Sequence, residues 1–492
     1  MPKKDLSLDT IVKYARRKGF VFQSSEIYGG FAATYDYGQL GVLLKKNLIE
    51  AWKYWMITSR TDVLEIEGAI FLHPKVWEAS GHIGNFADLM VDDLVTKKRF
   101  RADHLIEDAL VKMPDEIAKE FGNPELIGKI IDNAGGFTAE QADFVIKYYN
   151  LKSPDGNPLS TPKKFNLLVK THLGPVEDET SLVYLKGESC QNIYVDWKQV
   201  QETSRKKLPF GIAQMGKAFR NEITVKQYMF RTREFEQIDL QFFVKPQTEN
   251  EWFEFWKQYR YAFYTKYLGF STESVKWHKH DKGELVFYAT DAWDIYFKFG
   301  EMGFKELEGV HNRTDYDTRQ HQTFSGTDLT YLDPESNERY LPYIVEMSLG
   351  VNRLFLSALF EFYDEEKLES KEGENEDIRT VLRFPFDLAP YKIAVLPLMK
   401  KDGLGDKAQE IYADLRKAGL MADFDDAGSI GKRYRRQDEN GTPWCITIDY
   451  ETLDKDHQDF GTVTLRHRDS MSQIRIKIEE IQGYLNKIKF GK

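Results

Sequence analysis

Charged and aromatic side chains alternate along residues 216–239, GKAFRNEITVKQYMFRTREFEQID. The alternation predicts two antiparallel strands joined by a loop, because side chains two positions apart on a strand share a face. One face of the first strand then carries Gly216, Ala218, Arg220 and Glu222, and the returning strand adds Arg233, Phe235, Gln237 and Asp239. Guanidinium groups, carboxylates and an aromatic ring would therefore converge on one surface.

Such a surface suits a nucleoside triphosphate bound without a glycine-rich phosphate loop. Arg220 offers a planar fork to a phosphate oxygen, and Arg231, in the predicted loop, could close over the far phosphate. Phe235 offers a face on which a purine can stack, and Glu222 offers an acceptor for an exocyclic amine. The alternative is an ordinary hairpin whose arginines and glutamates form cross-strand ion pairs on a solvated face.

A second candidate element is VEMSLGVNRLF, residues 345–355. Glu346 and Ser348 fall on one face of a predicted strand, Gly350 permits a turn, and Arg353 lies in the first turn of a predicted helix. The free amides and the dipole of a helix N-terminus favour an anionic phosphate, and Arg353 adds a full positive charge. We therefore expect a second phosphate contact here.

These two elements resemble motifs 2 and 3 of class II aminoacyl-tRNA synthetases, in the form found in homodimeric glycyl-tRNA synthetases. Other segments resemble that family in the same order: SEIYGGFAATYDYGQLGVLLKKNLIEAW (25–52), ASGHIGNFADLMVD (79–92), RFRADHLIE (99–107), NLLVKTHLGP (166–175), ELEGVHNRTDYDTRQHQTFSGTDL (306–329) and GSIGKRYRRQDENGTPWCITID (428–449). The resemblance implies an α+β fold, with a catalytic domain on an antiparallel sheet, a mixed helical insertion and a C-terminal α/β anticodon-binding domain.

The resemblance also implies a reaction and its substrates. It implies ATP-dependent attachment of glycine to tRNA(Gly) through a glycyl-adenylate, with release of AMP and pyrophosphate. Catalysis falls to Arg220, at the α-phosphate, and to Arg353, which shares the β- and γ-phosphates with Arg231. The implied ATP site comprises Arg220, Asn221, Glu222, Phe230, Arg231, Phe235, Glu306, Leu307, Gly350 and Arg353.

Two further sites follow from the same resemblance. Glu306 is expected to bind Mg²⁺. The glycine site comprises Glu188, Asp239 and Glu346 around the ammonium group, Ser348 nearby, and Arg101 or Arg313 to complete it. Glycine offers no side chain to grip, so the pocket must bind the ammonium strongly and leave no room beyond Cα.

The chain departs from the family pattern beside this pocket. The family's LRPETAQG is YLKGESCQN here, so Glu188 is kept while Lys186, Gly187, Ser189, Cys190 and Asn192 are different. Gln39, Met347 and Asn352 also differ from the usual Pro, Pro and Asp. Every phosphate-binding arginine is kept, so we expect an active enzyme with a locally adjusted glycine loop.

Composition sets limits on compartment and partners. The two cysteines, Cys190 and Cys445, fit no zinc spacing, so we expect neither a disulfide framework nor a zinc site. The N-terminal MPKKDLSLDTIVKYARRKGF lacks the apolar core of a signal peptide, and no stretch is long enough to cross a bilayer. A soluble protein of the reducing cytoplasm, without a membrane partner, is therefore expected.

A net charge of −10 is unusual for a protein that binds RNA, because RNA phosphates attract a basic surface. However, residues 361–377, EFYDEEKLESKEGENED, hold nine acidic residues and two lysines. Most of the imbalance lies in this segment, which we expect to be a polar, mobile connector. Total charge therefore argues neither for nor against tRNA.

The predicted organisation has five parts: residues 1–92 and 166–375 form the catalytic domain, 93–165 an insertion, 376–389 a linker and 390–492 the anticodon-binding domain. Leu40, Leu44, Leu48 and Trp52 predict a long helix, which is motif 1 of a homodimer interface in the family or else a plain core helix. Within the insertion we expect a helix at 103–121. In the last part, strands alternate with helices, which favours a mostly parallel sheet.

One predicted helix of the last part carries a basic cluster. Its members are Lys432, Arg433, Arg435 and Arg436. A solvated basic face is the simplest interpretation, whereas the resemblance favours contact with the RNA backbone.

Two other functions remain open at this point. A catalytically silent relative would keep the fold and a nucleic-acid surface, although loss of the phosphate-binding arginines would be expected there. A related ligase could pass its adenylate to another acceptor, although the resemblance to an anticodon-binding domain counts against it.

Overall fold

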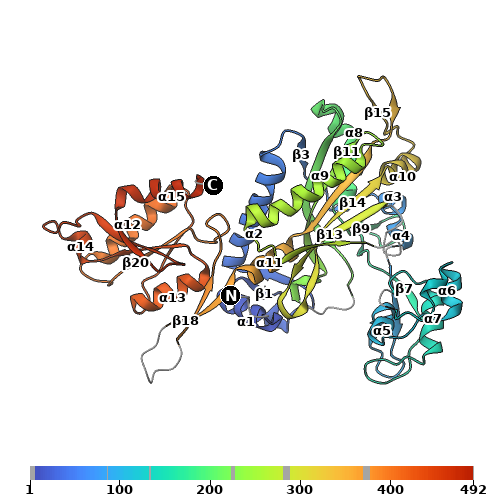
Figure 1. The fold of residues 1–492 in the computed structure, drawn as a ribbon, viewed down its shortest axis with the longest axis horizontal. Coiled ribbons are helices and arrows are strands. Elements are labelled where there is room, and N and C mark those ends of the chain that lie inside the picture. Colours follow the sequence, from blue (N-terminus) through green and yellow to red (C-terminus); the bar gives the residue numbers. More distant parts are fainter. Residues whose placement is uncertain are drawn as a thin grey trace.

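A computed structural model of the protein describes residues 6–85, 87–131, 134–222, 228–280, 289–368 and 377–490. Figure 1 places residues 393–490 at one end of the molecule, the insertion at the other, and a large sheet between them. Over the described ranges, every helix is too short or too polar to traverse a lipid bilayer.

The central sheet has seven strands in the order β12-β13-β14-β17-β11-β10-β3. All neighbours are antiparallel except β10 and β3. The strands are β12 (Val275–Lys279), β13 (Asp291–Lys298), β14 (Phe304–Thr314), β17 (Tyr343–Gly350), β11 (Glu234–Val244), β10 (Phe210–Phe219) and β3 (Val63–Ile66). The sheet is antiparallel as predicted, apart from this one edge pair.

Alternation along β11 divides its side chains between two layers. Ile238, Leu240 and Phe242 are fully buried in the main core, together with residues of helices α1 (Leu8–Lys18), α2 (Gln39–Lys53), α9 (Glu249–Ala262) and α11 (Val351–Phe362). Phe243 belongs instead to a separate cluster with α8 (Cys190–Ser204). Asp239, an even number of positions from Phe243, therefore lies on the face opposite the main core, which leaves that face available for a polar site.

Short elements surround this sheet. They are β1 (Val21–Gln23), β2 (Tyr35–Tyr37), β4 (Phe71–Leu72), α3 (Pro74–Ala79), α4 (His82–Asn85), β8 (Lys170–His172), β9 (Leu182–Leu185), α10 (Tyr316–Ser325), β15 (Tyr331–Leu332) and β16 (Arg339–Tyr340). The predicted motif 1 helix is α2, with Leu40, Leu44 and Leu48 buried, and it continues into a π-helical turn at Tyr54–Thr58.

The insertion has its own core. Strands β5 (Ala87–Asp92), β6 (Arg99–Arg101) and β7 (Lys163–Asn166) form a small antiparallel sheet beside helices α5 (Ala102–Asp108), α6 (Asp115–Glu120) and α7 (Ala139–Tyr148). The single helix expected at 103–121 is in fact two, α5 and α6. Pro114 immediately precedes α6 with extended backbone, and proline cannot continue a helix from the preceding turn because it lacks the N–H donor.

The C-terminal sheet has the order β21-β20-β22-β23-β24. Its strands are β20 (Ile393–Pro397), β21 (Ala422–Phe424), β22 (Trp444–Ile448), β23 (Thr462–His467) and β24 (Gln473–Lys477), and its helices are α12 (Leu404–Lys417), α13 (Ile430–Asn440), α14 (Tyr450–Leu453) and α15 (Ile481–Phe490). Only the pairs of β20 with β21 and β22 are parallel; the pairs of β23 are antiparallel. The sheet is thus mixed rather than mostly parallel. Only the four-residue helix α14 separates β22 from β23, and a turn joins β23 to β24, so neither link is a crossover that would place the next strand parallel.

The acidic segment at 361–377 differs from the expected mobile connector. Its first residues finish α11 and form strand β18 (Tyr363–Leu368), which pairs with β19 (Asp377–Leu382); residues 369–376 lie outside the described ranges. Part of the predicted linker, 376–389, is therefore a strand. After β19, Phe384, Leu388 and Ala389 are buried in the main core. Asn47 Nδ2 donates to the carbonyl oxygens of Leu388 and Ala389 at 3.1 and 2.9 Å.

Candidate active site

A cavity of about 190 Å³ opens on the polar side of the sheet, between β10, β11, β14, β17 and α11. Every residue predicted for ATP lines it except Asn221. Asn221 is exposed and its backbone N–H donates to Leu167 O at 2.8 Å. The cavity also takes in Thr232, Gln237, Ser348 and Asn352. Segments far apart in sequence thus meet at one site.

The two predicted strands pair as the alternation requires. Gly216 faces Gln237 and Ala218 faces Phe235 across β10 and β11, and the Arg220 N–H donates to Arg233 O at 2.9 Å. The Arg220 guanidinium carbon lies 5.3 Å from the Phe235 ring centroid, within reach of a cation–π contact. Its Nε donates to Gly187 O at 3.1 Å. This bond links Arg220 to the loop whose sequence departs from the family pattern. Residues 223–227 of the predicted loop lie outside the described ranges.

Arg353 lies in the first turn of α11, as predicted, and two neighbouring side chains hold it. Its Nη1 lies 3.0 Å from Glu306 Oε2 and donates to Glu306 O at 3.1 Å. The guanidinium carbon also lies 4.4 Å from the Phe230 ring centroid. The Glu306 side chain is about half exposed (49%), so incoming phosphate can compete with its carboxylate for Arg353.

Glu222 and Arg231 form a second ion pair at the cavity wall. Glu222 is nearly buried, with 6% exposure, and its Oε2 is 3.8 Å from Arg231 Nε. Arg233 Nε donates to the Glu222 carbonyl oxygen at 3.0 Å. The carboxylate is thus held beside a partly exposed guanidinium at the cavity wall.

Asp239 is fully buried beside three polar side chains. Ser189 Oγ donates to Asp239 Oδ2, and Gln237 Nε2 donates to Asp239 Oδ1 at 3.2 Å and to Ser348 Oγ at 2.9 Å. Burial raises the pKa of Asp239 to about 7, and the charge of Glu346 adds to the effect, whereas the hydroxyls of Ser189 and Ser348 oppose it. This carboxyl group therefore changes its charge near neutral pH.

Glu346 is buried but ionised, because cations surround it. Arg313 Nη1 donates to both of its oxygens at 3.0 and 2.9 Å, His311 Nδ1 lies 3.0 Å from Oε2, and Gln241 Nε2 donates to Oε1 at 2.8 Å. Burial alone would raise the pKa of Glu346, but Arg313 and His311 outweigh it and lower the pKa to about 2. Arg313 also grips Asp317 through two hydrogen bonds of 2.8 and 2.9 Å.

Glu188 is the third acid of the predicted glycine site. His82 Nε2 lies 3.4 Å from its Oε1, which also accepts from Gln191 Nε2 at 2.8 Å and from Cys190 Sγ at 3.0 Å. Burial opposes ionisation, yet His82 and Arg313 hold the pKa of Glu188 well below its usual range. Charges from all three acids act on the neighbouring Cys190 thiol, whose pKa is raised mainly by burial.

Arg101 and Arg313, the two alternatives for completing the glycine site, lie in different surroundings. Arg313 joins Glu346 directly, whereas Arg101 lies 3.1 Å from Asp88 and pairs with Asp103, both in the insertion. The geometry therefore favours Arg313 as the residue beside the acids. The charges of Asp103, Asp88 and Glu222 raise the pKa of Arg101 against the effect of burial.

Lys186 and Asn192, two residues that depart from the family pattern, each lie against a glycine that leaves room for their side chains. A Cβ at Gly216 would lie 3.0 Å from Lys186 Nζ, and one at Gly68 would lie 2.3 Å from Asn192 Cγ. Lys186 is 1% exposed, and burial lowers its pKa. Its Nζ donates to Gly68 O at 3.4 Å, so a backbone oxygen accepts from this buried ammonium group.

His311 and Gln241 belong to the acidic cluster but were not predicted. His311 bridges Glu346 and Asp294, and these two carboxylates outweigh its burial and raise its pKa to about 9. The signal was present in the alternation, since His311 shares a strand face with Arg313 and Gln241 shares one with Asp239. Alternation along one strand does not show which neighbouring strand His311 or Gln241 will face.

The four basic residues of α13 differ in exposure: Arg433 is buried, whereas the other three line a surface groove. Arg433 is 3% exposed and donates to the backbone oxygens of Gly428 and Pro397, so the RNA contact predicted for it is wrong. Arg435 pairs with Asp377, and Arg436 bonds to Asp425. These two and the exposed Lys432 line a surface groove beside β19 and remain candidates for phosphate contact.

Comparison with known proteins finds family matches for two parts of the chain. Residues 175–363 match the tRNA synthetase class II core domain (G, H, P, S and T), and residues 392–488 match the anticodon binding domain. The chain is similar to glycine–tRNA ligases of Treponema denticola (48% identical over 482 residues; 98% of this chain and 97% of the relative) and Clostridium acetobutylicum (46% over 490 residues; 99% and 100%). It is also similar to that of Chlorobaculum tepidum (44% over 482 residues; 97% and 99%).

Proposed function

The chain belongs to the glycine–tRNA ligase family of class II tRNA synthetases, and we propose that it uses ATP to attach glycine to tRNA(Gly) in two steps at the cavity described above. The glycine carboxylate attacks the α-phosphorus of ATP to give glycyl-adenylate and pyrophosphate. The terminal hydroxyl of the tRNA then takes the glycyl group and releases AMP. The observation that carries the proposal is the meeting of Arg220, Arg231 and Arg353 beside the buried acids.

The arginines orient and neutralise the triphosphate. We assign Arg220 to the α-phosphate, and Arg353 and Arg231 to the β- and γ-phosphates. In-line displacement at phosphorus needs alignment and charge stabilisation more than it needs an acid or a base. The adenine is proposed to stack on Phe235 and to donate from its exocyclic amine to Glu222. Arg220 also contacts the Phe235 ring, so the residues proposed for the base and for the α-phosphate hold each other in place.

Asp239, Glu346, Glu188 and Ser348 are proposed to surround the glycine ammonium. Arg313 and His311 keep Glu346 ionised, so a negative charge is present before the substrate arrives. Asp239 loses its proton more readily once an ammonium lies beside it, because an opposite charge favours the ionised form. The cluster thus binds the part of glycine that every amino acid shares, and exclusion of larger side chains must come from the lack of space beyond Cα.

Glu306 fits a role as a protein ligand of Mg²⁺ because its carboxylate is half exposed at the cavity wall. Mg²⁺ is usually held by one or two carboxylates, water and the substrate's phosphates, and when bound it would neutralise charge on the departing pyrophosphate. In this structure, Arg353 pairs with Glu306. A triphosphate that engages Arg353 would leave the Glu306 oxygens available to the metal.

We further propose that the protein acts as a homodimer. The segment before α2 exposes large apolar side chains: Ile27 is 88% exposed, Tyr28 87% and Phe31 55%. Clustered apolar exposure of this kind typically marks a protein contact. The segment also runs beside the catalytic hairpin, since the Arg233 N–H donates to Ala33 O at 3.0 Å. A tRNA substrate and two buried free thiols are consistent with action in the cytoplasm.

Glycine-dependent exchange of pyrophosphate into ATP tests the first step, and charging of tRNA(Gly) tests the second. We expect both activities with glycine and far less exchange with alanine. A folded protein that supports no glycine-dependent exchange would refute the assignment and favour a silent relative. Exchange without charging would favour a ligase with another acceptor.

A further inference from the structure

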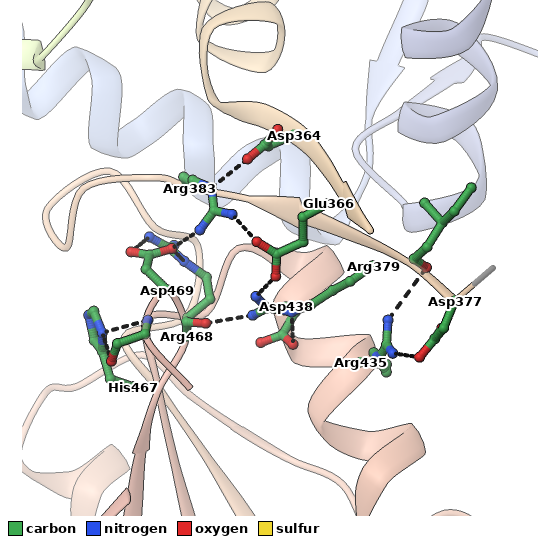
Figure 2. Close-up of polar contacts among 12 residues, drawn as sticks. Asp364, Glu366, Asp377, Arg379, Arg383, Arg435, Asp438, His467, Arg468 and Asp469 are labelled. Carbon is green, nitrogen blue, oxygen red and sulfur yellow. Dashed lines mark hydrogen bonds and ion pairs between the residues drawn. The ribbon is translucent and has the colours of Figure 1, made fainter. Parts of the chain in front are cut away.

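A buried ionic cluster joins hairpin β18–β19 to the C-terminal domain (Figure 2). At its centre is Arg379 of β19, which has no exposed surface. Its Nε donates to Asp438 Oδ2 of α13 at 2.8 Å, Nη2 donates to Arg468 O, and Nη1 pairs with Glu366 of β18. One guanidinium therefore bonds to the hairpin and to two segments of the C-terminal domain.

A second arginine repeats the connection nearer the core. Arg383 donates to Asp364 at 2.8 Å and to Glu366 at 2.7 Å in β18, and to Asp469 of the C-terminal domain at 3.0 Å. Arg468 in turn donates to Phe384 O at 2.9 Å, just beyond β19. Arg379, Asp438 and Arg468 are buried and their bonds are directional, so another orientation of the C-terminal domain would leave these charges without partners.

The hairpin is itself fixed to the ATP site. Helix α11 begins at Val351, carries the cavity residue Arg353 in its first turn and ends at Phe362, and β18 begins at the next residue. All residues of α11 other than Arg353 are buried, so the helix is a rigid connection of about 18 Å, at 1.5 Å per residue. The ionic cluster thus links the C-terminal domain to the helix that carries Arg353.

We propose that Arg379 is a positioning residue for the tRNA-dependent step: it holds the C-terminal domain at one orientation, so that tRNA bound there presents its 3′ end at the adenylate. The proposal rests on the function proposed above. The first step needs only groups of the catalytic domain and does not depend on this orientation. The second step does, since a reactant held on a loosely tethered domain has a lower effective concentration at the site.

Arg379→Met is the informative variant because it leaves no carboxylate without a cation. Asp438 keeps two hydrogen bonds from Arg466, of 2.9 and 3.1 Å, and Glu366 keeps Arg383. Methionine also fills much of the arginine's volume. We expect glycine-dependent exchange within about twofold of wild type, and kcat/KM for tRNA charging lowered about tenfold or more.

Arg475→Met is the matched control. Arg475 also pairs with carboxylates, Asp449 and Glu451, but both lie within the C-terminal domain. We expect this control to keep both activities. Equal loss of exchange and charging in Arg379→Met, or unchanged charging in that variant, would overturn the proposal.

A measurement without substrates separates this inference from the proposed function. Spin labels on Glu202→Cys, in α8, and Lys417→Cys, in α12, report the distance between the two parts of the molecule; both side chains are exposed, and the natural cysteines are buried. Arg379→Met should broaden the distance distribution, whereas Arg475→Met should not. A distribution as narrow as that of wild type would refute the positioning role even if the enzyme proved active, and absence of exchange in wild type would instead refute the proposed function.

Discussion

Protonation of Asp239 is expected to control glycine binding around neutral pH. Burial, with the like charge of Glu346, raises its pKa to about 7, and only the ionised carboxylate attracts the substrate's ammonium group. Free glycine keeps its ammonium over this range. The value of kcat/KM for glycine should therefore be low in acid and rise to a plateau as the pH passes about 7, since kcat/KM reports the groups of the free enzyme.

The magnitude follows from the fraction ionised. A carboxyl group with a pKa of about 7 is about one-tenth ionised at pH 6 and about nine-tenths ionised at pH 8, a tenfold change worth about 1.4 kcal/mol. Two other groups of the cluster titrate outside this window, because the pKa of Glu346 is about 2 and that of His311 about 9. The expected profile is therefore a single step.

Glycine-dependent pyrophosphate exchange at saturating ATP, measured from about pH 5.5 to 8.5, gives this profile. Ser189→Ala removes a hydrogen bond that lowers the pKa of Asp239, so it should move the midpoint to higher pH. Asp239→Asn should abolish the step. A wild-type midpoint near the ordinary aspartate value, or a flat profile that persists unchanged in Asp239→Asn, would show that the reasoning from burial is wrong.

Further predictions concern the phosphate site and the core. Arg220→Ala should abolish exchange, whereas Lys217→Ala, which breaks an exposed pair on the same strand, should leave it nearly intact; near-normal activity of Arg220→Ala would contradict the assigned role. Arg260→Met leaves the buried Glu308 carboxylate with no guanidinium partner, so urea unfolding should show a loss of about 3–5 kcal/mol. Arg99→Met, in an exposed pair with Asp92, should cost less than about 1 kcal/mol, and equal losses for the two variants would refute the argument from burial.

The phosphate-binding hairpin could be predicted because its pattern is local. Strand alternation fixes which side chains share a face, so Arg220, Phe235 and Asp239 could be grouped before any partner strand was known. The structure confirms their register across β10 and β11. Glu346, Ser348 and Arg353 followed from the same logic, since a strand, a glycine and an apolar helix occur consecutively in sequence.

Other features depended on partners far along the chain. The sequence identified Arg433 as basic, but its burial against Gly428 and Pro397 comes from packing of α13 on the sheet. The acidic run at 361–377 suggested a solvated connector, yet Arg379 and Arg383 neutralise part of it within a folded hairpin. Charge type limits which residues can pair, but it does not say which residues do.

The sequence by itself determined the strand faces proposed for the phosphate and ammonium contacts, because these depend on local periodicity. The order of its motifs indicated the family, and the family resemblance implied the catalytic and anticodon-binding parts. Only the tertiary structure decided that Arg313 rather than Arg101 faces Glu346, that His311 joins the acidic cluster, and that a buried arginine links the two parts. The reason is physical: the pKa of a buried acid and the role of a buried cation depend on distances between strands, which local sequence does not encode.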